Sequence, residues 1–215
     1  MKGLIRGALA VLGLEVFRAR GGVFVCPKPR AGKGTPLRSF PSPLRVHLGC
    51  GNKRHEGYVN IDLVPTPATD MVSDVTRLEG FGDATADEIR LEAVYEHLFR
   101  HERRSAIREW FRVLKPGGVL QLYWIPDFDA VATAYVNRAP GLLGPVFDLD
   151  EVYRFTHGDP VAWNAPEQLH KDVFSAASVE AELREAGYEI VSVERKCFAD
   201  EKFPVNLNVI ARRPS

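Results

Sequence analysis

The stretch Arg45-Val-His-Leu-Gly-Cys-Gly51, followed by Tyr58-Val-Asn-Ile-Asp-Leu63, decides the fold class of this 215-residue chain. The first run is extended and ends in two glycines, and the second alternates apolar and polar residues up to an acid. Glycines at a strand end let the backbone turn tightly and approach a ligand closely. In an open α/β sheet, ligands bind beyond the carboxyl ends of the strands. We therefore predict two strands of such a sheet, with a ligand site at Gly49, Gly51 and Asp62.

The rest of the chain continues the alternation of strands and helices. Ile107, Trp110, Phe111 and Leu114 have helical spacing, with Ser105 as the predicted cap and 116–118 as the stop. A second helix is expected from Ser175 to Ala186, with Gly187 ending it. Further strands are predicted at 70–74, 86–93, 119–125, 189–197 and 206–212.

The order of these elements predicts an α/β fold: a Rossmann-like, mostly parallel sheet with helices on both faces. The last two strands are joined only by Phe198–Val205, which is too short for a parallel crossover. We therefore expect the sheet to end in a C-terminal antiparallel hairpin.

The N-terminal part, 1–43, reads as a helix and a basic linker ahead of a domain at 44–215. Through Arg45 the sequence has nine Lys or Arg and one acid, a charge of +8 in a chain whose net charge is +0. The apolar run in Met1–Leu14 is too short to span a bilayer. Two interpretations stay open: this helix docks on the domain, or 1–20 contact a membrane surface or a partner. Residues 21–43, rich in Gly, Pro and basic residues, are predicted to be the linker.

Composition excludes several classes of function. A net charge of +0 gives no whole-molecule attraction to nucleic acid, so no nucleic-acid partner is expected. Cys26, Cys50 and Cys197 are far apart and show no CxxC or Cys/His ligand spacing. Neither a disulfide framework nor a metal site is therefore predicted. A reducing cytoplasm is the simplest compartment, with the inner face of the membrane as the alternative for the N-terminal helix.

The glycine run also restricts the cofactor. A dinucleotide fingerprint needs a third glycine where Arg54 stands, and an acid about 20 residues on, whereas Asp62 follows Gly51 by 11 residues. No GK[ST] phosphate loop occurs. The site keeps a ribose acid and lacks a phosphate cradle, which suits a nucleoside cofactor such as S-adenosyl-L-methionine (SAM).

Five motifs lie along the domain: Leu48-Gly-Cys-Gly-Asn-Lys53, Gly57-Tyr-Val-Asn-Ile-Asp62, Glu96-His97, Leu114-Lys-Pro-Gly-Gly118 and Ile125-Pro-Asp127. Together they resemble class I SAM-dependent methyltransferases. The resemblance spans about 44–214 and is strongest to a type 11-like group that is often associated with cell-surface polysaccharide genes.

The resemblance implies a cofactor-binding role for nine residues. Gly49, Cys50 and Gly51 would contact the methionine part of SAM, Asp62 the ribose, Leu63 the adenine, and Asp74 and Val75 the adenine edge, with Glu92 and Ala93 beside the sulfonium. Glu92 departs from the family, which usually has a small or polar residue there. It would either favour the positive sulfonium or face water.

Three residues are candidates for catalysis. Asp127 follows a predicted strand and could act on an acceptor hydroxyl or cap the next segment. His97, in the Glu96-His97 pair, could act as a base or be structural. His170 ends the irregular, aromatic segment 128–170, which we interpret as an acceptor-side insertion or lid, and is a further candidate base.

These inferences predict SAM-dependent methyl transfer to a hydroxyl or amine of a small-molecule or glycan-like acceptor. A nicotinamide oxidoreductase is disfavoured by the missing third glycine. A non-catalytic SAM-binding partner module stays open, because this chemistry needs no indispensable nucleophile.

Overall fold

The computed structural model describes residues 14–19, 22–27, 40–158 and 168–215, in two compact units that divide after Gly34. The first unit contains an antiparallel pair, β1 (Leu14–Ala19) and β2 (Gly22–Pro27). The predicted N-terminal helix lies outside the described residues, apart from Leu14, which begins β1. Strand β2 corrects the linker prediction, because the β-branched and aromatic run Val23-Phe-Val25 favours a strand over the flanking Gly and Pro.

The second unit is built on a seven-stranded sheet with the order β5-β4-β3-β6-β7-β9-β8. Strands β3 to β7 are parallel, and β9 pairs antiparallel with both β7 and β8. The predicted mostly parallel sheet with an antiparallel C-terminal pair is confirmed. The bounds are β3 Arg45–Leu48, β4 Val59–Asp62, β5 Met71–Val72, β6 Ala86–Glu92, β7 Leu114–Pro126, β8 Glu189–Lys196 and β9 Asn206–Arg212.

The order of the strands reverses at β3. Strand β4 lies on one side of β3, and β6, which follows β5 in the chain, lies on the other side. In open α/β sheets such a switch point is where the carboxyl ends open a crevice for a ligand. The loop that follows β3 contains the predicted Gly49 and Gly51, and we call it the glycine loop.

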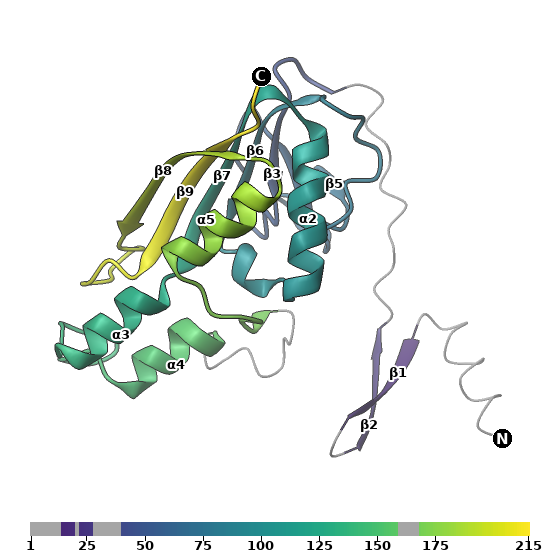
Figure 1. The fold of residues 1–215 in the computed structure, drawn as a ribbon. Helices are drawn as coiled ribbons and strands as arrows, with labels where there is room; N and C mark the ends of the chain where they lie inside the picture. Colours follow the sequence, from purple (N-terminus) through teal and green to yellow (C-terminus); the bar gives the residue numbers. More distant parts are fainter. Residues whose placement is uncertain (1–13, 20–21, 28–39, 159–167) are drawn as a thin grey trace. The chain divides into compact units, whose positions relative to one another are not determined.

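Two helices, α2 (Arg100–Val113) and α5 (Ala176–Glu185), pack on one face of the sheet. Figure 1 shows them side by side in front of the strands. Buried residues of both helices, including Trp110 and Leu183, join Leu91 and Leu122 of the sheet in one apolar core. Burial of this face supplies most of the hydrophobic stabilisation of the domain.

The bounds of the two helices test the predicted caps. Ser175 caps α5 and Gly187 follows it at φ +98°, as predicted. Helix α2 begins five residues before the predicted Ser105, whose hydroxyl instead donates to the His101 carbonyl within the helix. The Glu102 carboxylate accepts from Phe99 N at 3.2 Å, so a side chain of the first turn stabilises the start.

The opposite face of the sheet carries polar side chains. Asn60, His47, Arg90 and Gln121 lie next to one another across four strands. In the described part of the chain, a loop rather than a helix contacts this face: Tyr58 donates to Glu88, and His55 lies 3.0 Å from Glu92. Only 49–58 join β3 to β4, too few residues for a long crossover helix.

Beyond the carboxyl end of β7, helices α3 (Phe128–Val136) and α4 (Leu149–His157) form a second apolar cluster (Figure 1). This is the described part of the predicted insertion, and it is more regular than its sequence suggested. Among the described residues, no helix is long and apolar enough to cross a membrane.

Candidate functional site

The glycine loop after β3 is closely packed against the end of β6. Gly49 and Gly51 adopt φ values of +68° and +51°, in the left-handed region that favours glycine. A Cβ on Gly49 would lie 2.4 Å from Cγ2 of Val94, so only glycine fits. A Cβ on Gly51 would meet nothing within 4 Å, so this part of the loop faces open space.

Asp62, at the end of β4, is bonded to the glycine loop. Its Oδ2 accepts from Gly51 N at 2.7 Å, and its Oδ1 accepts from Val64 N at 3.0 Å. A carboxylate has about four lone-pair positions, so Asp62 can accept further hydrogen bonds. The structure therefore brings together the predicted glycines and the predicted ribose acid.

Cys50 contributes to the loop through its backbone. Its amide donates to the Ile61 carbonyl at 3.0 Å, and its buried Sγ lies 3.6 Å from Oγ1 of Thr69. Burial raises the pKa of the Cys50 thiol, which keeps the sulfur neutral.

The ends of β4 and β5 expose apolar side chains beside an acid. Leu63 and Val64 are 52% and 58% exposed, unusually high for large apolar residues. Asp74 is exposed, and its Oδ1 accepts hydrogen bonds from the amide and the hydroxyl of Thr76. The carbonyl of Val75 accepts a hydrogen bond from Nε1 of Trp110 at 2.8 Å. Val75 is therefore fixed to the core, while Leu63 and Asp74 face outward.

Glu92 is surrounded by two cations and a histidine ring. Its carboxylate lies 2.5 Å from Lys53 Nζ, 2.5 Å from Arg90 Nη2 and 3.0 Å from His55 Nε2. Burial acts to raise the pKa of Glu92, but the bonds from Lys53 and Arg90 outweigh it and bring that pKa to about 2. Only 8% of the side chain is exposed. Of the two interpretations of Glu92, facing water is therefore wrong, and its charge is compensated within the protein.

Backbone strain marks the ends of β6 and β7. Ala93 and Trp124 are non-glycine residues at φ +50° and +70°. Ala93 N donates to the Tyr123 carbonyl at 3.0 Å, which holds the strained residue in place. Residues in this region concentrate at functional sites. The sequence carried no signal for Trp124, because residue type does not reveal φ.

Asp127 is a buried helix cap that is paired with a half-exposed arginine. Its Oδ1 accepts from Asp129 N at 3.3 Å at the start of α3, and its Oδ2 lies 2.5 Å from Nε of Arg195 on β8. The residue is fully buried. The capping interpretation is therefore supported, and the expected action on an acceptor is corrected, because this carboxylate has no exposed surface to offer.

The other two catalytic candidates lie together. The ring centroids of His97 and His170 are 5.2 Å apart, and Lys171 N donates to the Glu96 carbonyl at 2.8 Å. Burial lowers the pKa of both histidines, that of His97 to about 4, and raises the pKa of Glu96 to about 8. The sequence points to Glu96 only as part of the Glu96-His97 motif, and its burial was not foreseeable from its position.

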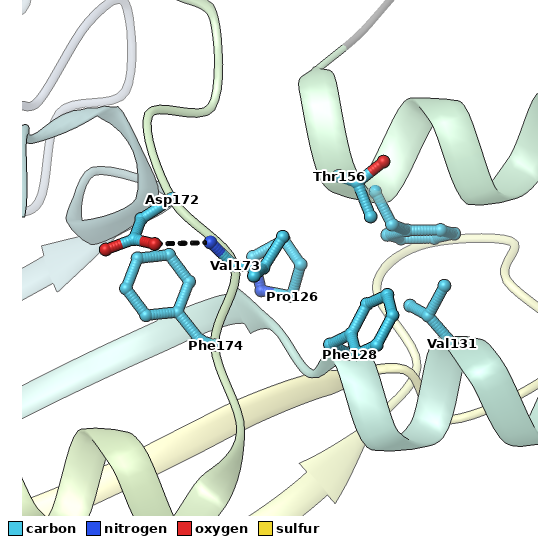
Figure 2. A pocket seen from close by; sticks show the side chains of 8 residues that line it. Pro126, Phe128, Val131, Thr156, Asp172, Val173 and Phe174 are labelled. Atoms are coloured by element: carbon cyan, nitrogen blue, oxygen red, sulfur yellow. Dashed lines mark hydrogen bonds between the residues drawn. The ribbon is translucent and has the colours of Figure 1, made fainter.

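A small hollow lies between α3, α4 and the segment that leads to α5 (Figure 2). The space within it, open solvent included, is about 190 Å³. In Figure 2, Pro126 at the end of β7 lies between Phe128 and Phe174, and Val173 N donates to Asp172 Oδ1 at 3.0 Å. The lining residues are Pro126, Phe128, Val131, Phe155, Thr156, Asp172, Val173 and Phe174.

Residues 46–122 match the family described as a methyltransferase domain. The chain has the fold of SAM-dependent methyltransferases. A SAM-dependent methyltransferase from Mesorhizobium loti is 17% identical, with a TM-score of 0.54 over 79% of this chain and 90% of that one. A methyltransferase structure from Listeria monocytogenes is 13% identical, with a TM-score of 0.55 over 84% and 95% of the two chains.

The third similar structure carries ligands. It is the 1,6-didemethyltoxoflavin-N1-methyltransferase of Burkholderia thailandensis with bound 1,6-didemethyltoxoflavin and S-adenosylhomocysteine. It is 15% identical, with a TM-score of 0.54 over 80% of this chain and 71% of that one. No curated protein matches the chain. Together the family match and these structures support a class I methyltransferase.

Proposed function

We propose that this chain is a SAM-dependent methyltransferase that acts on a hydroxyl or amine of a small-molecule or glycan-like acceptor. The observation that carries the proposal is the 2.7 Å hydrogen bond from Gly51 N to Asp62 Oδ2, which joins a left-handed glycine loop to a strand-end acid at the switch point. The family match over 46–122 and the shared fold support it.

The residues present fit SAM. The Asp62 carboxylate would accept from the ribose hydroxyls, the exposed Leu63 would pack on the adenine, and Asp74 would accept from its exocyclic amine. Gly49, Cys50 and Gly51 would approach the methionine part through backbone atoms, where the open space at Gly51 leaves room. Val75, Glu92 and Ala93 would line the same crevice, with Glu92 already neutralised by Lys53 and Arg90. The bound S-adenosylhomocysteine of the Burkholderia enzyme supports this cofactor.

When bound, SAM supplies an electrophilic methyl group on a sulfonium. The residues of the chain would assist the transfer by aligning the acceptor and excluding water, since charge is dispersed during the transfer. The ends of β6 and β7, where Ala93 and Trp124 are strained, would face the methyl group. The acceptor would lie between these strand ends and the hollow at Pro126 and Phe174.

The acceptor side offers aromatic surface and neutral bases. Phe128 and Tyr153 are 44% and 49% exposed, and exposed aromatic faces are suited to stacking on a sugar or a flat ring. His97 and His170 have lowered pKa values and would be neutral near pH 7, as a base must be. The link to cell-surface glycans rests on the motif resemblance, and contact with an anionic surface would involve the basic N-terminal part.

Calorimetry with the purified full chain tests the cofactor. We expect SAM and S-adenosylhomocysteine to bind and NAD to give no heat. Transfer of tritiated methyl from SAM to pools of sugars, sugar nucleotides and amines then tests the activity. Binding of NAD but not of SAM would contradict the proposal. Binding of SAM with no transfer to any pool would favour the non-catalytic partner module instead.

A further inference from the structure

Glu96 is a buried carboxyl group with one oxygen that lacks a hydrogen-bond partner in the described part of the chain. Only 2% of the residue is exposed, and Oε2 has no partner among the described residues. Nε2 of His97 lies 4.0 Å from Oε1 of Glu96. Leaving a polar group buried without a partner costs on the order of 1–3 kcal/mol, so such a group calls for an explanation.

Two histidines lie beside this carboxyl group with fixed tautomers. Nδ1 of His97 is 3.3 Å from the Leu169 carbonyl, and Nδ1 of His170 is 2.9 Å from the Phe155 carbonyl. A carbonyl oxygen can only accept, so in each ring Nδ1 carries the proton and Nε2 carries the lone pair. Histidines that bind metals show this arrangement, with one nitrogen on the metal and the other donating to a carbonyl or carboxylate.

The three side chains converge on one point. One nitrogen of each ring and one oxygen of Glu96 all lie within 4.8 Å of one another. Backbone bonds fix their positions: Lys171 N donates to the Glu96 carbonyl at 2.8 Å, and His170 N donates to the His157 carbonyl at 3.2 Å. The convergence therefore results from the packing of the 168–172 segment on the turn Tyr95–His97 (η1).

We propose that Glu96, His97 and His170 bind a divalent transition-metal ion through one carboxylate oxygen and the two Nε2 atoms, a role that replaces that of the two histidines as bases. Imidazole and carboxylate ligands suit ions such as Zn²⁺. Two histidines and a glutamate form a three-ligand set that leaves a coordination position open for a water or another ligand. Bonds of roughly 2.0–2.1 Å place tetrahedral ligands about 3.3 Å apart, so the side chains would close by about an ångström on binding.

A second cluster of two histidines and a glutamate differs in the charged groups that surround its carboxylate. One ligand atom each from His47, His55 and Glu92 also lies within 4.8 Å of the others. The Glu92 carboxylate, however, is already bonded to Lys53 and Arg90, and these cations occupy the place a metal would take. In the part of the chain that the structure describes, Glu96 has no such cation, so we assign the metal to this cluster alone.

Zinc titration of the full chain tests the proposal without requiring methyl transfer. The protein is stripped with a chelator and titrated with ZnCl₂ by calorimetry, as wild type and as Glu96→Gln, His170→Gln and His101→Gln. His101 is an exposed histidine of α2, so its variant controls for binding at surface histidines. Loss of a ligand should weaken binding by at least the roughly 10–100-fold that a second-shell change causes.

Thermal unfolding in the presence and absence of zinc supplies a second readout, and circular dichroism shows that each variant is folded. We expect one zinc per chain and a zinc-dependent rise in Tm for wild type and His101→Gln, because a ligand that binds the folded state stabilises it. Both effects should be lost in Glu96→Gln and His170→Gln. Equal zinc affinity in all four proteins, or no zinc binding by wild type, would overturn the assignment.

Discussion

Arg103 of α2 and Glu182 of α5 form two parallel hydrogen bonds, Nε to Oε2 and Nη2 to Oε1, each 2.7 Å long. Arg103 is 1% exposed, and its guanidinium also lies 4.7 Å from the centroid of the Phe174 ring. Tyr95 donates to the same carboxylate at 2.6 Å. This pair therefore links α2 and α5 to each other, to Tyr95 of η1 and to Phe174, which lines the hollow.

Arg103→Leu should destabilise the domain strongly. Removal of one partner leaves the largely buried Glu182 carboxylate uncompensated, which typically costs about 3–5 kcal/mol. Urea unfolding, followed by the fluorescence of buried Trp110, measures the loss. Arg100→Leu is the matched control, because Arg100 pairs with Asp172 but is 67% exposed. That variant should lose no more than about 1 kcal/mol. Equal losses would show that burial of the pair has no energetic importance.

Asp62→Ala should weaken SAM binding. The variant removes the carboxylate expected to accept from the ribose, and it frees Gly51 N, so about 1–3 kcal/mol of binding free energy should be lost. Calorimetry gives the change in Kd, and Asp83→Ala, at an exposed acid, serves as the control. An unchanged Kd in Asp62→Ala would remove Asp62 from the cofactor site.

Gly49→Ala and Gly57→Ala separate backbone strain from close packing. Both glycines have positive φ, +68° and +80°, so each substitution should cost roughly 1–2 kcal/mol of strain. At Gly57 the new Cβ meets nothing within 4 Å, whereas at Gly49 it meets Val94 at 2.4 Å. A β-branched neighbour yields little, so Gly49→Ala should lose a further ~1–3 kcal/mol. Similar free energies of unfolding for the two variants would contradict the close approach of Gly49 to Val94.

Glu92 should make stability depend on acid pH. Its pKa is about 2 in the folded protein against an ordinary value of 4.5, so the charged form is favoured by folding. Its contribution is fully present above about pH 4.5 and is lost as the pH falls toward 2. Because Lys53 is 61% exposed and screened by solvent, we expect about 1–2 kcal/mol at pH 7.

Urea unfolding between pH 7 and pH 2.5 measures this contribution as the difference between wild type and Glu92→Gln. That difference should shrink as the pH falls. Glu56→Gln changes a glutamate that is 89% exposed, and it should differ little from wild type at any pH. A constant gap between wild type and Glu92→Gln across the range would show that the ion pairs of Glu92 do not stabilise the fold.

Several features of the fold could be predicted because their causes are local. The short Phe198–Val205 connection forces an antiparallel pair, and Ser175 caps its helix with its own hydroxyl. The start of α2 was missed because its cap residue is Phe99, and not the Ser, Thr, Asp or Asn that usually signals a cap. The first turn is stabilised instead by the Glu102 carboxylate, which accepts from Phe99 N. Strand β2 was missed because the Gly, Pro and basic residues around it favoured the prediction of a linker, despite its short run of β-forming residues.

The sequence by itself determined the parallel sheet and the meeting of the Gly49 and Gly51 loop with Asp62, because these residues lie close together in the chain at the ends of neighbouring strands. Only the tertiary structure decided what the other charged groups do. Asp127 meets Arg195 of β8, Glu92 meets Lys53 and Arg90, and His97 meets His170 from a distant segment. The protonation and the role of such a group depend on which partners the fold brings within a few ångströms and on how much water it removes.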